Sequence, residues 1–573
     1  MRVAMVPGPG GRCWTAELAS DGAALGQAVT HDSVPAAVAA LERAASGQPD
    51  GVRWVWPTTA SVYPALLRAG VEVARCYDVA LLEALLLGRE GRMKEPASLA
   101  GAWARLHGLA APASRPGQQA AQQQAVLFEP ADPVFPTPEA ALAAVIEVHA
   151  DQQRRITADE HPDRFTLLAA ADSAGSLAAA EMSHHGLPWR ADVHTDLLTA
   201  LLGIRPAPGM RPPRLASLAA AISEAFGGRP VNPDSPAQVS RALAADGVRV
   251  PSTRSAVLRE CGHPAAPLLL EYKELARLHT ANGWTWLEEW VSDGRFRPEY
   301  VVAGVVSGRW ASRGGGALQI PRVLRRAVVA DPGWVLVVAD AAQLEPRVLA
   351  ALSGDSALAV AAGTGDLYEA LAGMFGGDRA KVKIALLSAM YGGAAGEARQ
   401  LLAVLQSRFP DAARYVEEAA RAGEEGRVVR SRLGRTCPPP SQAWRGLTAV
   451  ADDPATGDRR AGLSLRARGR FTRNFVVQAS AADWAAVLLA LLRTRLATLE
   501  VPDTGDVPNN PDRAHLVFFQ HDEVVVHCPS SQAEAAVAAV QEAADEAGRL
   551  VFGHTPVRFP VTTAVVPTYA DAK

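Results

Sequence analysis

Two aspartates that are far apart in the chain stand where strand-like segments end. Asp340 closes the apolar run 334–340, and Asp522 lies in the two-residue gap between two β-rich segments, 516–520 and 523–528. A strand that leads into a helical pattern places its last residue at the carboxyl edge of a sheet, and a two-residue hairpin loop presents its residues at the tip. We therefore expect the two carboxylates to converge at one edge of a sheet.

Paired carboxylates of this kind suit metal-dependent phosphoryl transfer. Two divalent ions held about 3.5 to 4 Å apart activate an attacking hydroxyl and neutralise the charge of a leaving pyrophosphate. Carboxylate oxygens are hard ligands that suit Mg²⁺, which keeps water and substrate phosphates as its remaining ligands. Asp340 and Asp522 are therefore the expected metal ligands, and two Mg²⁺ ions, which Mn²⁺ could replace, are the expected cofactors.

A segment with cations at helical spacing lies between these carboxylates. In the run 379–392, Arg379, Lys383, Leu387 and Tyr391 step by four, so that on a helix they share one broad face about 18 Å long. The two cations suit the phosphates of a nucleoside triphosphate, and the Leu387 and Tyr391 end suits its sugar and base. The alternative is an ordinary surface helix with its basic side chains in water.

The elements that must position these residues form several structural units, because 573 residues are too many for one core. We expect a small α/β unit, a Gln-, Ala- and Pro-rich linker, a helical region, and strands that enclose a helical block of about 356–470. The expected helices are 34–45, 79–87, 268–290 and 343–352, and the expected strands are 52–56, 300–306, 335–339, 516–519 and 524–528.

Composition narrows the class of protein without deciding it. The five cysteines are scattered and form no Cys-x-x-Cys pair, so neither a disulfide framework nor a zinc site is expected. No window of some 18 apolar residues and no signal-peptide pattern is present, which predicts a cytoplasmic location and no membrane partner. The net charge of −3 argues mildly against nucleic acid. Arginine clusters within 322–326, 427–435 and 459–473 argue for it, although any one of them could be a solvated surface.

Several sequence blocks together resemble the family A DNA polymerases of the bacterial DNA polymerase I type. Ala339 to Arg347 looks like the first palm motif of that family, Arg379 to Gly392 like its nucleotide-binding helix, and His521-Asp522-Glu523 like its second metal motif. The resemblance covers about 170–573, with the blocks in order and at sensible spacing. The further matching blocks are 232–236, 271–275, 307–309, 318–321, 474 and 478–483.

The resemblance implies a role for each matching residue. The catalytic residues would be Asp340, Asp522, Lys383 and Glu523, with Asp340 and Asp522 binding the metals. The nucleotide would be bound by Arg379, Lys383, Leu387, Tyr391, Gln343 and Glu345, of which Glu345 blocks the ribose 2′ hydroxyl. Primer-template DNA would be contacted by Arg309, Gln319, Arg470, Asn474, Gln478, His521, Lys273 and Arg277. Arg309 and Gln478 would probe the minor groove, where correct base pairs offer similar acceptors.

The fold class that the resemblance implies is α/β and multidomain, built like a right hand. The helical thumb would be 139–300, the antiparallel-sheet palm 301–355 and 471–573, and the helical fingers 356–470, behind an N-terminal domain at 1–110 and a linker at 111–138. The N-terminal domain takes the place of a 3′-5′ exonuclease, but it has no Asp-x-Glu and no Tyr-x-x-x-Asp, so we expect a degenerate domain without proofreading. We expect no 5′ nuclease domain in this chain.

The implied activity is DNA-directed addition of deoxynucleotides to a primer 3′ end by a monomer, in DNA repair or gap filling. One rival is a polymerase that accepts ribonucleotides, against which Glu345 and Tyr391 argue; another is a non-catalytic DNA-binding scaffold. The sequence departs from the family at Ala341, Ala342 and Pro346, and Leu387 replaces an aromatic residue. Leu387 offers the nucleotide apolar contact in place of stacking, which predicts altered sugar discrimination or lower catalytic efficiency.

Overall fold

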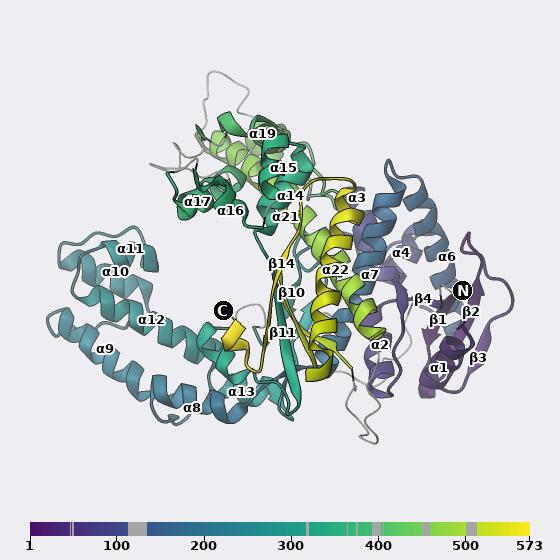
Figure 1. The fold of residues 1–573 in the computed structure, drawn as a ribbon, viewed down its shortest axis with the longest axis horizontal. Coiled ribbons are helices and arrows are strands. Elements are labelled where there is room, and N and C mark those ends of the chain that lie inside the picture. The colour runs from purple at the N-terminus through teal and green to yellow at the C-terminus, as the bar shows by residue number, and fades with distance from the viewer. Residues whose placement is uncertain are drawn as a thin grey trace. The chain divides into compact units, whose positions relative to one another are not determined.

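The chain, seen in a computed structural model, divides into two compact units (Figure 1). One unit contains Met1–His184, Tyr300–Ala311 and Ala339–Ala564, and the other contains His185–Glu299, Ser312–Val338 and Val565–Lys573. The structure describes residues 1–45, 47, 51–112, 134–316, 320–363, 365–373, 376–391, 403–404, 406–449, 459–499 and 513–572. Most of the expected linker at 111–138 lies outside the described residues.

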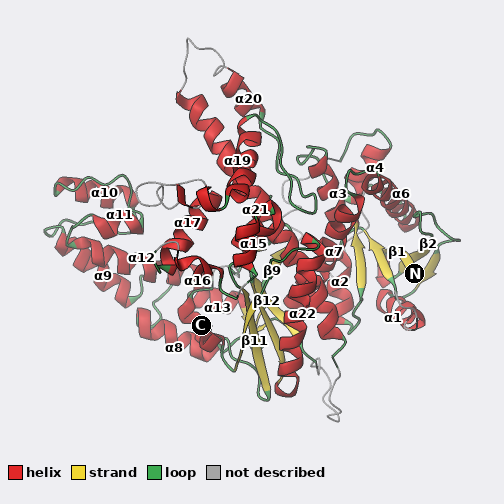
Figure 2. Cartoon of the chain, turned by 45° about the horizontal axis from the view of Figure 1, so that its top comes forward, coloured by secondary structure: helices red, strands yellow, loops and turns green. Residues whose placement is uncertain are grey.

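The N-terminal region is built on a five-stranded mixed sheet in the order β3-β2-β1-β4-β5. The strands are β1 Arg2–Pro7, β2 Cys13–Leu18, β3 Val29–His31, β4 Arg53–Trp56 and β5 Arg75–Asp78. β2 runs antiparallel to β1 and to β3, whereas β4 runs parallel to β1 and to β5. Strands with buried residues on both faces need helices on both faces, and Figure 2 shows this sheet flanked by helices. The expected helix 34–45 is confirmed as α1 Val34–Ala45.

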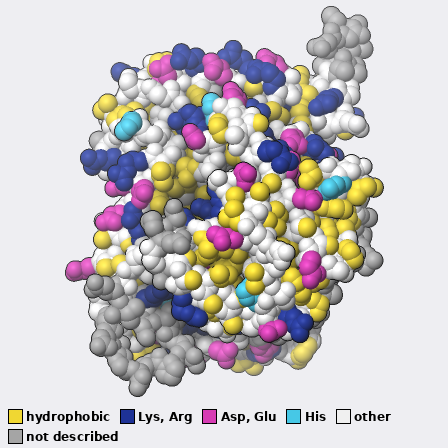
Figure 3. Space-filling view, turned by 90° about the vertical axis from the view of Figure 1, so that its right-hand side faces the viewer, with side chains coloured by type: hydrophobic (Ala, Val, Ile, Leu, Met, Phe, Trp, Pro, Cys, Tyr) yellow, Lys and Arg dark blue, Asp and Glu magenta, His cyan; other side chains and the backbone are white. Residues whose placement is uncertain are grey.

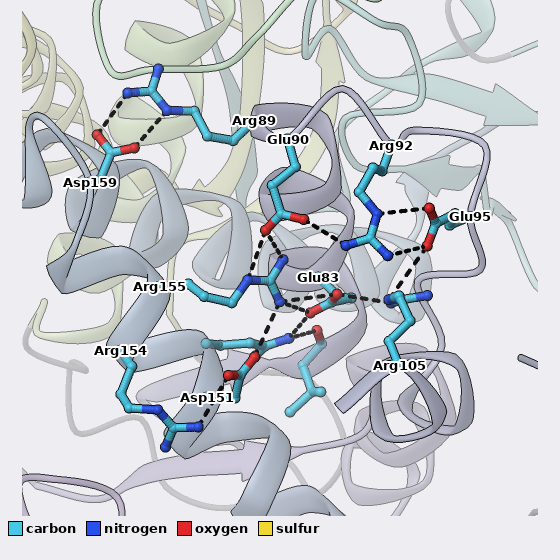
Figure 4. Close-up of polar contacts among 12 residues, drawn as sticks. Glu83, Arg89, Glu90, Arg92, Glu95, Arg105, Asp151, Arg154, Arg155 and Asp159 are labelled. Carbon is cyan, nitrogen blue, oxygen red and sulfur yellow. Dashed lines mark hydrogen bonds and ion pairs between the residues drawn. The ribbon is translucent and has the colours of Figure 1, made fainter. Parts of the chain in front are cut away.

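Helices α3 Val79–Arg89, α4 Leu99–Leu106 and α6 Pro138–Thr157 are joined by a network of ion pairs (Figure 4). At its centre is Glu83, whose side chain is 1% exposed and accepts hydrogen bonds from Arg105 (2.8 Å) and Arg155 (3.0 Å). A buried carboxylate is tolerated when cations and hydrogen bonds surround it. On the face drawn in Figure 3, basic and acidic side chains are likewise interspersed.

The second unit is mainly helical. It contains α8 Ala191–Leu202, α9 Pro213–Ala225, α10 Pro236–Ala245, α11 Ser255–Glu260, α12 Ala265–Asn282 and α13 Trp284–Trp290. The expectation of one helix over 268–290 is wrong, because the chain breaks at Gly283. A Cβ atom at Gly283 would lie 2.2 Å from the carbonyl oxygen of His279, so only glycine permits this turn.

A four-stranded sheet in the order β12-β13-β11-β14 carries the expected carboxylates. Its strands are β11 Trp334–Ala341, β12 His515–Gln520, β13 Glu523–Pro529 and β14 Val561–Val566, which confirms the three strands expected here. In Figure 1 the long helices α21 Arg459–Ala497 and α22 Ala533–Phe552 lie alongside this sheet. The expected strand 300–306 is wrong: β9 is only Glu299–Val301, and the chain then turns at Ala303, whose φ is 50°.

The helical block expected at 356–470 is present in the described residues. It consists of α15 Ser356–Ala362, α16 Leu367–Ala372, α17 Arg379–Tyr391, α19 Pro410–Glu424, α20 Gln442–Ala449 and the first part of α21. The expected boundary at 470 falls inside α21, which runs on without a break. In the part of the chain that is described, α21 alone is long and apolar enough to cross a membrane, and 83% of its apolar window is buried inside the protein.

A buried arginine joins α21 to α7 Pro162–His185. Arg435 donates to Asp172 (2.9 Å) and Asp483 (3.3 Å), and the side chains of all three residues are at most 6% exposed. Burial raises the pKa of Asp483 although Arg435 opposes the rise. Arg435 was one of the arginines whose clustering suggested nucleic acid, but in the structure it is a core residue.

Replacing Arg435 by methionine should therefore destabilise the protein strongly. The variant leaves two carboxylates buried without their cation, and such a change costs about 3 to 5 kcal/mol. Urea denaturation should show this loss, whereas Arg549→Met, at an exposed position on α22, should stay within about 0.5 kcal/mol of the parent. Equal stabilities of the two variants would contradict the role given to Arg435.

Candidate active site

A backbone hydrogen bond brings the two candidate carboxylates to the same end of the four-stranded sheet. Asp340 is the penultimate residue of β11, and the next residue, Ala341, donates its N–H to the carbonyl oxygen of Asp522 at 3.0 Å. The side chains of Asp340 and Asp522 are both partly exposed. The two carboxylates are thus carried on neighbouring strands at one edge, as their positions in the sequence predict.

Asp522 owes its place to a two-residue hairpin. Gln520 and Glu523 are paired across β12 and β13, so His521 and Asp522 form the turn. His521 has a φ of 58°, and two-residue hairpin loops need positive φ because that twist matches the twist of the strands. Burial lowers the pKa of His521, although its side chain is largely exposed, and Glu523 is buried beside the turn.

Asp340 and Asp522 fit a site for divalent cations that is completed by substrate. Both offer hard oxygen ligands at an edge that solvent reaches. No group of three or more His, Cys, Asp or Glu side chains that could hold a metal ion occurs among the residues that the structure describes. The protein therefore provides a pair of carboxylates, and water and substrate phosphates would have to supply the other ligands.

The helix after Asp340 begins with an unusual residue. α14 Leu344–Ser353 is preceded by Gln343, which has a left-handed backbone with φ 56°. Positive φ is uncommon outside glycine and persists only where surrounding contacts hold it. Pro346 lies in the first turn of α14, where a missing N–H costs no intrahelical hydrogen bond.

Arg347 stabilises the turn between β11 and α14 from the interior of the protein. It was named in the sequence only as the last residue of a matching block. Its side chain is fully buried. It donates to the carbonyl oxygens of Ala342 (2.9 Å), Ala362 (2.5 Å) and Gly365 (2.6 Å), and to Gln343 Oε1 (3.2 Å). A guanidinium has five N–H donors in one plane, so this single side chain ties the segment at 342–343 to the segment at 362–365. Burial lowers its pKa.

Arg309 and Glu345, for which the resemblance implies contacts to DNA and to the sugar, form an ion pair with each other. The Glu345 side chain is 15% exposed and that of Arg309 is 38% exposed. The pair joins the Ser307-Gly308-Arg309 turn to the first turn of α14. The implied sugar-blocking carboxylate is therefore held in place by the implied minor-groove arginine.

The cationic helix is confirmed as α17 Arg379–Tyr391. Asp378 caps its start by accepting from Ala380 N at 2.9 Å. Arg379 pairs with Asp366 at 2.9 Å, and Lys383 is exposed. The side chains of Leu387 and Tyr391, and the whole of Gln319 and Gly392, lie outside the described residues, so the expected shared face is seen only at its cationic end.

The other expected DNA contacts lie on α21 and in the second unit, and their side chains are exposed or partly exposed. On α21, Arg470, Asn474 and Gln478 are spaced by four, and the Asn474 amide lies 2.7 Å from the carbonyl oxygen of Met390 at the end of α17. In the second unit, Lys273 donates to the carbonyl and hydroxyl oxygens of Thr253, so its ammonium group is engaged inside that unit. Arg277 is exposed.

Asp78 in the N-terminal region is a structural residue. It is 1% exposed, caps α3 by accepting from Leu81 N (3.0 Å), and also accepts from Thr59 N (2.7 Å). Burial raises its pKa. A carboxylate enclosed by backbone N–H groups is poorly placed to bind a metal.

Comparisons with known proteins point to one family. Residues 212–570, more than half of the chain, match the family model described as DNA polymerase family A. DNA polymerase I of Chloroflexus aurantiacus is 28% identical over 306 residues, which cover 48% of this chain and 29% of the relative. The thermostable DNA polymerase I of Thermus filiformis is 29% identical over 318 residues, which cover 50% of this chain and 34% of the relative.

A solved structure resembles the whole fold. It is the POL domain of Pol1 from M. smegmatis, in complex with DNA primer-template and dNTP, and it superposes with a TM-score of 0.70 at 20% identity. The alignment covers 100% of this chain and 96% of that one. Hence the fold is that of a polymerase domain over its full length, while the matches span about a third of the length of the curated relatives.

Substituting Arg347 by methionine should destabilise the contact between the segments at 342–343 and 362–365. The carbonyl oxygens of Ala342 and Gly365 would lose their Arg347 donors, and the buried oxygen of Ala362 would keep only the bond from Arg558 N. A buried polar group that loses its partner costs about 1 to 3 kcal/mol. Hydrogen exchange at Leu367 N, which is bonded to Gln343, should accelerate more than exchange in the N-terminal sheet. Uniform acceleration throughout the chain would mean that Arg347 stabilises the protein only globally.

Proposed function

Because the chain belongs to DNA polymerase family A, we propose that it is a DNA-directed DNA polymerase that adds deoxynucleotides to the 3′ end of a primer. The observation that carries the proposal is the hydrogen bond from Ala341 to Asp522, which brings Asp340 and Asp522 to one sheet edge. The family match and the POL-domain fold support it independently. The substrates are then primer-template DNA and deoxynucleoside triphosphates.

Asp340 and Asp522 would hold two Mg²⁺ ions in this reaction. The ions, when bound, activate the primer 3′ hydroxyl and neutralise charge on the triphosphate. Arg379 and Lys383 would bind the phosphates from the side of α17, because both are cations on one face of that helix. Glu345 would exclude a ribose 2′ hydroxyl while its ion pair with Arg309 fixes its position, which favours deoxynucleotides.

The DNA would lie against α21 and the turn at Arg309. Arg470, Asn474 and Gln478 follow one another on a row of α21, and a row at steps of four residues is suited to following a strand of DNA. The amide of Asn474 faces the backbone at Met390, which would link the DNA-binding row to the nucleotide helix.

We further propose that the N-terminal region is an exonuclease-like domain that no longer proofreads. Its mixed sheet and the role of Asp78 as a buried helix cap support this reading. A polymerase without proofreading suits repair or gap filling. The thumb, palm and fingers boundaries, the monomeric state and the cytoplasmic location stay predictions from the sequence.

The proposal is tested most directly by replacing Asp522 with asparagine. Loss of several kcal/mol of charge stabilisation should reduce primer extension with Mg²⁺ by more than about a hundredfold. The matched control is Asp545→Asn, at an exposed position on α22, which should extend primers at the parental rate. Undiminished extension by the Asp522 variant would refute the proposed chemistry.

Leu387 gives a second test, of sugar discrimination. The change Leu387→Phe restores an aromatic face against the nucleotide, and stacking of this kind contributes about 0.5 to 1.5 kcal/mol. We expect the ratio of dideoxy to deoxynucleotide incorporation to change by about two- to tenfold. Identical ratios in parent and variant would show that residue 387 does not contact the sugar.

A further inference from the structure

Asp366, between α15 and α16, binds two different groups with its two carboxylate oxygens. Oδ1 accepts from the backbone N–H groups of Tyr368 (2.9 Å) and Glu369 (3.0 Å), which caps α16, and from Gln343 Nε2 (2.8 Å). Oδ2 accepts from Nε (3.1 Å) and Nη2 (2.9 Å) of Arg379. One oxygen is thus a helix cap and the other holds a guanidinium.

The capped side of Asp366 is tied to the strand that carries Asp340. Gln343 donates to Asp366, and its Oε1 accepts from Leu367 N (2.9 Å) and from Arg347 Nη2 (3.2 Å). Gln343 lies three positions after Asp340, and its left-handed backbone points the amide to α16. A continuous chain of hydrogen bonds therefore runs from Gln343, two residues after the end of β11, through Asp366 to Arg379.

Arg379 is restrained by this contact and keeps donors to spare. Its guanidinium carbon lies 5.3 Å from the centre of the Tyr368 ring, a cation–π distance. Among the described residues, Asp366 accepts from Nε and Nη2, so the Nη1 donors of the planar group remain for a ligand. The Arg379 side chain is 50% exposed, so solvent reaches part of it.

The ion pair is poorly explained as a source of stability. Asp366 and Arg379 are 40% and 50% exposed, and exposed pairs contribute little because water screens them. Burial acts to raise the pKa of Asp366, but the Glu369 N–H, Arg379 and Gln343 together lower it, so the carboxylate is charged at neutral pH. What the pair does supply is a fixed plane for the guanidinium.

We infer that Asp366 is a positioning residue that orients Arg379 so that the free edge of its guanidinium faces the triphosphate of the incoming deoxynucleotide. The inference rests on the proposed polymerase function. Lys383 lies one turn further along α17 on the same face, so an oriented Arg379 and Lys383 present adjacent cations. Orientation before binding matters because a mobile side chain must otherwise be ordered by the ligand itself.

The test is steady-state kinetics of Asp366→Asn. Asparagine is as good a helix cap as aspartate, so α16 keeps its N-terminal acceptor while Arg379 loses its counter-charge. We expect KM for the deoxynucleotide to rise about three- to tenfold, with kcat changed less than about twofold and the affinity for primer-template unchanged. Serine is also an uncharged capping residue, so Asp366→Ser should have the same KM as Asp366→Asn. Agreement between the two variants would show that the result does not depend on the folding of one of them.

Asp378→Asn is the matched control. Asp378 caps α17 next to Arg379 by accepting from Ala380 N and Lys381 N (3.2 Å), and the structure pairs Arg379 with Asp366 instead. The KM of the Asp378→Asn variant for the deoxynucleotide should equal that of the parent. In a double-mutant cycle, Arg379→Lys should raise KM on its own, and adding Asp366→Asn should raise it no further, because both remove the same oriented group.

The possible results separate this inference from the proposed function. A parent protein that extends no primer defeats the polymerase proposal itself. If the parent extends primers, then an unchanged or lower KM in Asp366→Asn, an equal rise in Asp378→Asn, or additive effects in the cycle would each overturn the role of Asp366. The role of Asp366 is supported if KM for the deoxynucleotide rises in the Asp366 variants and not in Asp378→Asn, and if Asp366→Asn raises KM no further in the Arg379→Lys background.

Discussion

The hydrogen bond between Ala341 and Asp522 is the contact on which the site depends. It joins residues 181 positions apart in the sequence and fixes both members of a carboxylate pair at one sheet edge. Two like charges so placed repel, and that repulsion is relieved when cations lie between them. In the proposed polymerase reaction, this edge of the sheet would therefore favour divalent metal ions, and the surrounding elements would bind the rest of the substrate.

Several arginines stabilise the interior of the structure. Arg347, Arg435 and Arg493 are buried or nearly so, and each makes several hydrogen bonds to carboxylates or backbone carbonyls. The planar guanidinium suits such positions because its donors point in fixed directions. Counting arginines in the sequence therefore overstated the basic surface: the run 427–435 contributes Arg435 to the core, and Arg427 pairs with Glu425.

Local pattern predicted the elements of the site well, and long-range pairing limited the rest. The strands 335–339, 516–519 and 524–528, the hairpin at 521–522 and the helix from 379 follow from apolar runs and spacing, and all are confirmed. The break at Gly283 and the turn at Ala303 were missed because apolar periodicity continues through both. No sequence pattern marks Asp366 as the partner of Arg379, or Glu345 as that of Arg309, since charge pairing is set only once distant segments meet.

A third arginine, Arg493, ties the long helix α21 to the N-terminal region. Arg493, near the end of α21, donates to the carbonyl oxygens of Val73 and Ala74 and to Glu181 (2.6 Å), so the helix is anchored in the N-terminal region. Without those acceptors a buried guanidinium would be left unsatisfied, at a cost of several kcal/mol. Because α21 also carries Arg470, Asn474 and Gln478, contacts with the N-terminal region help to fix the position of these three residues.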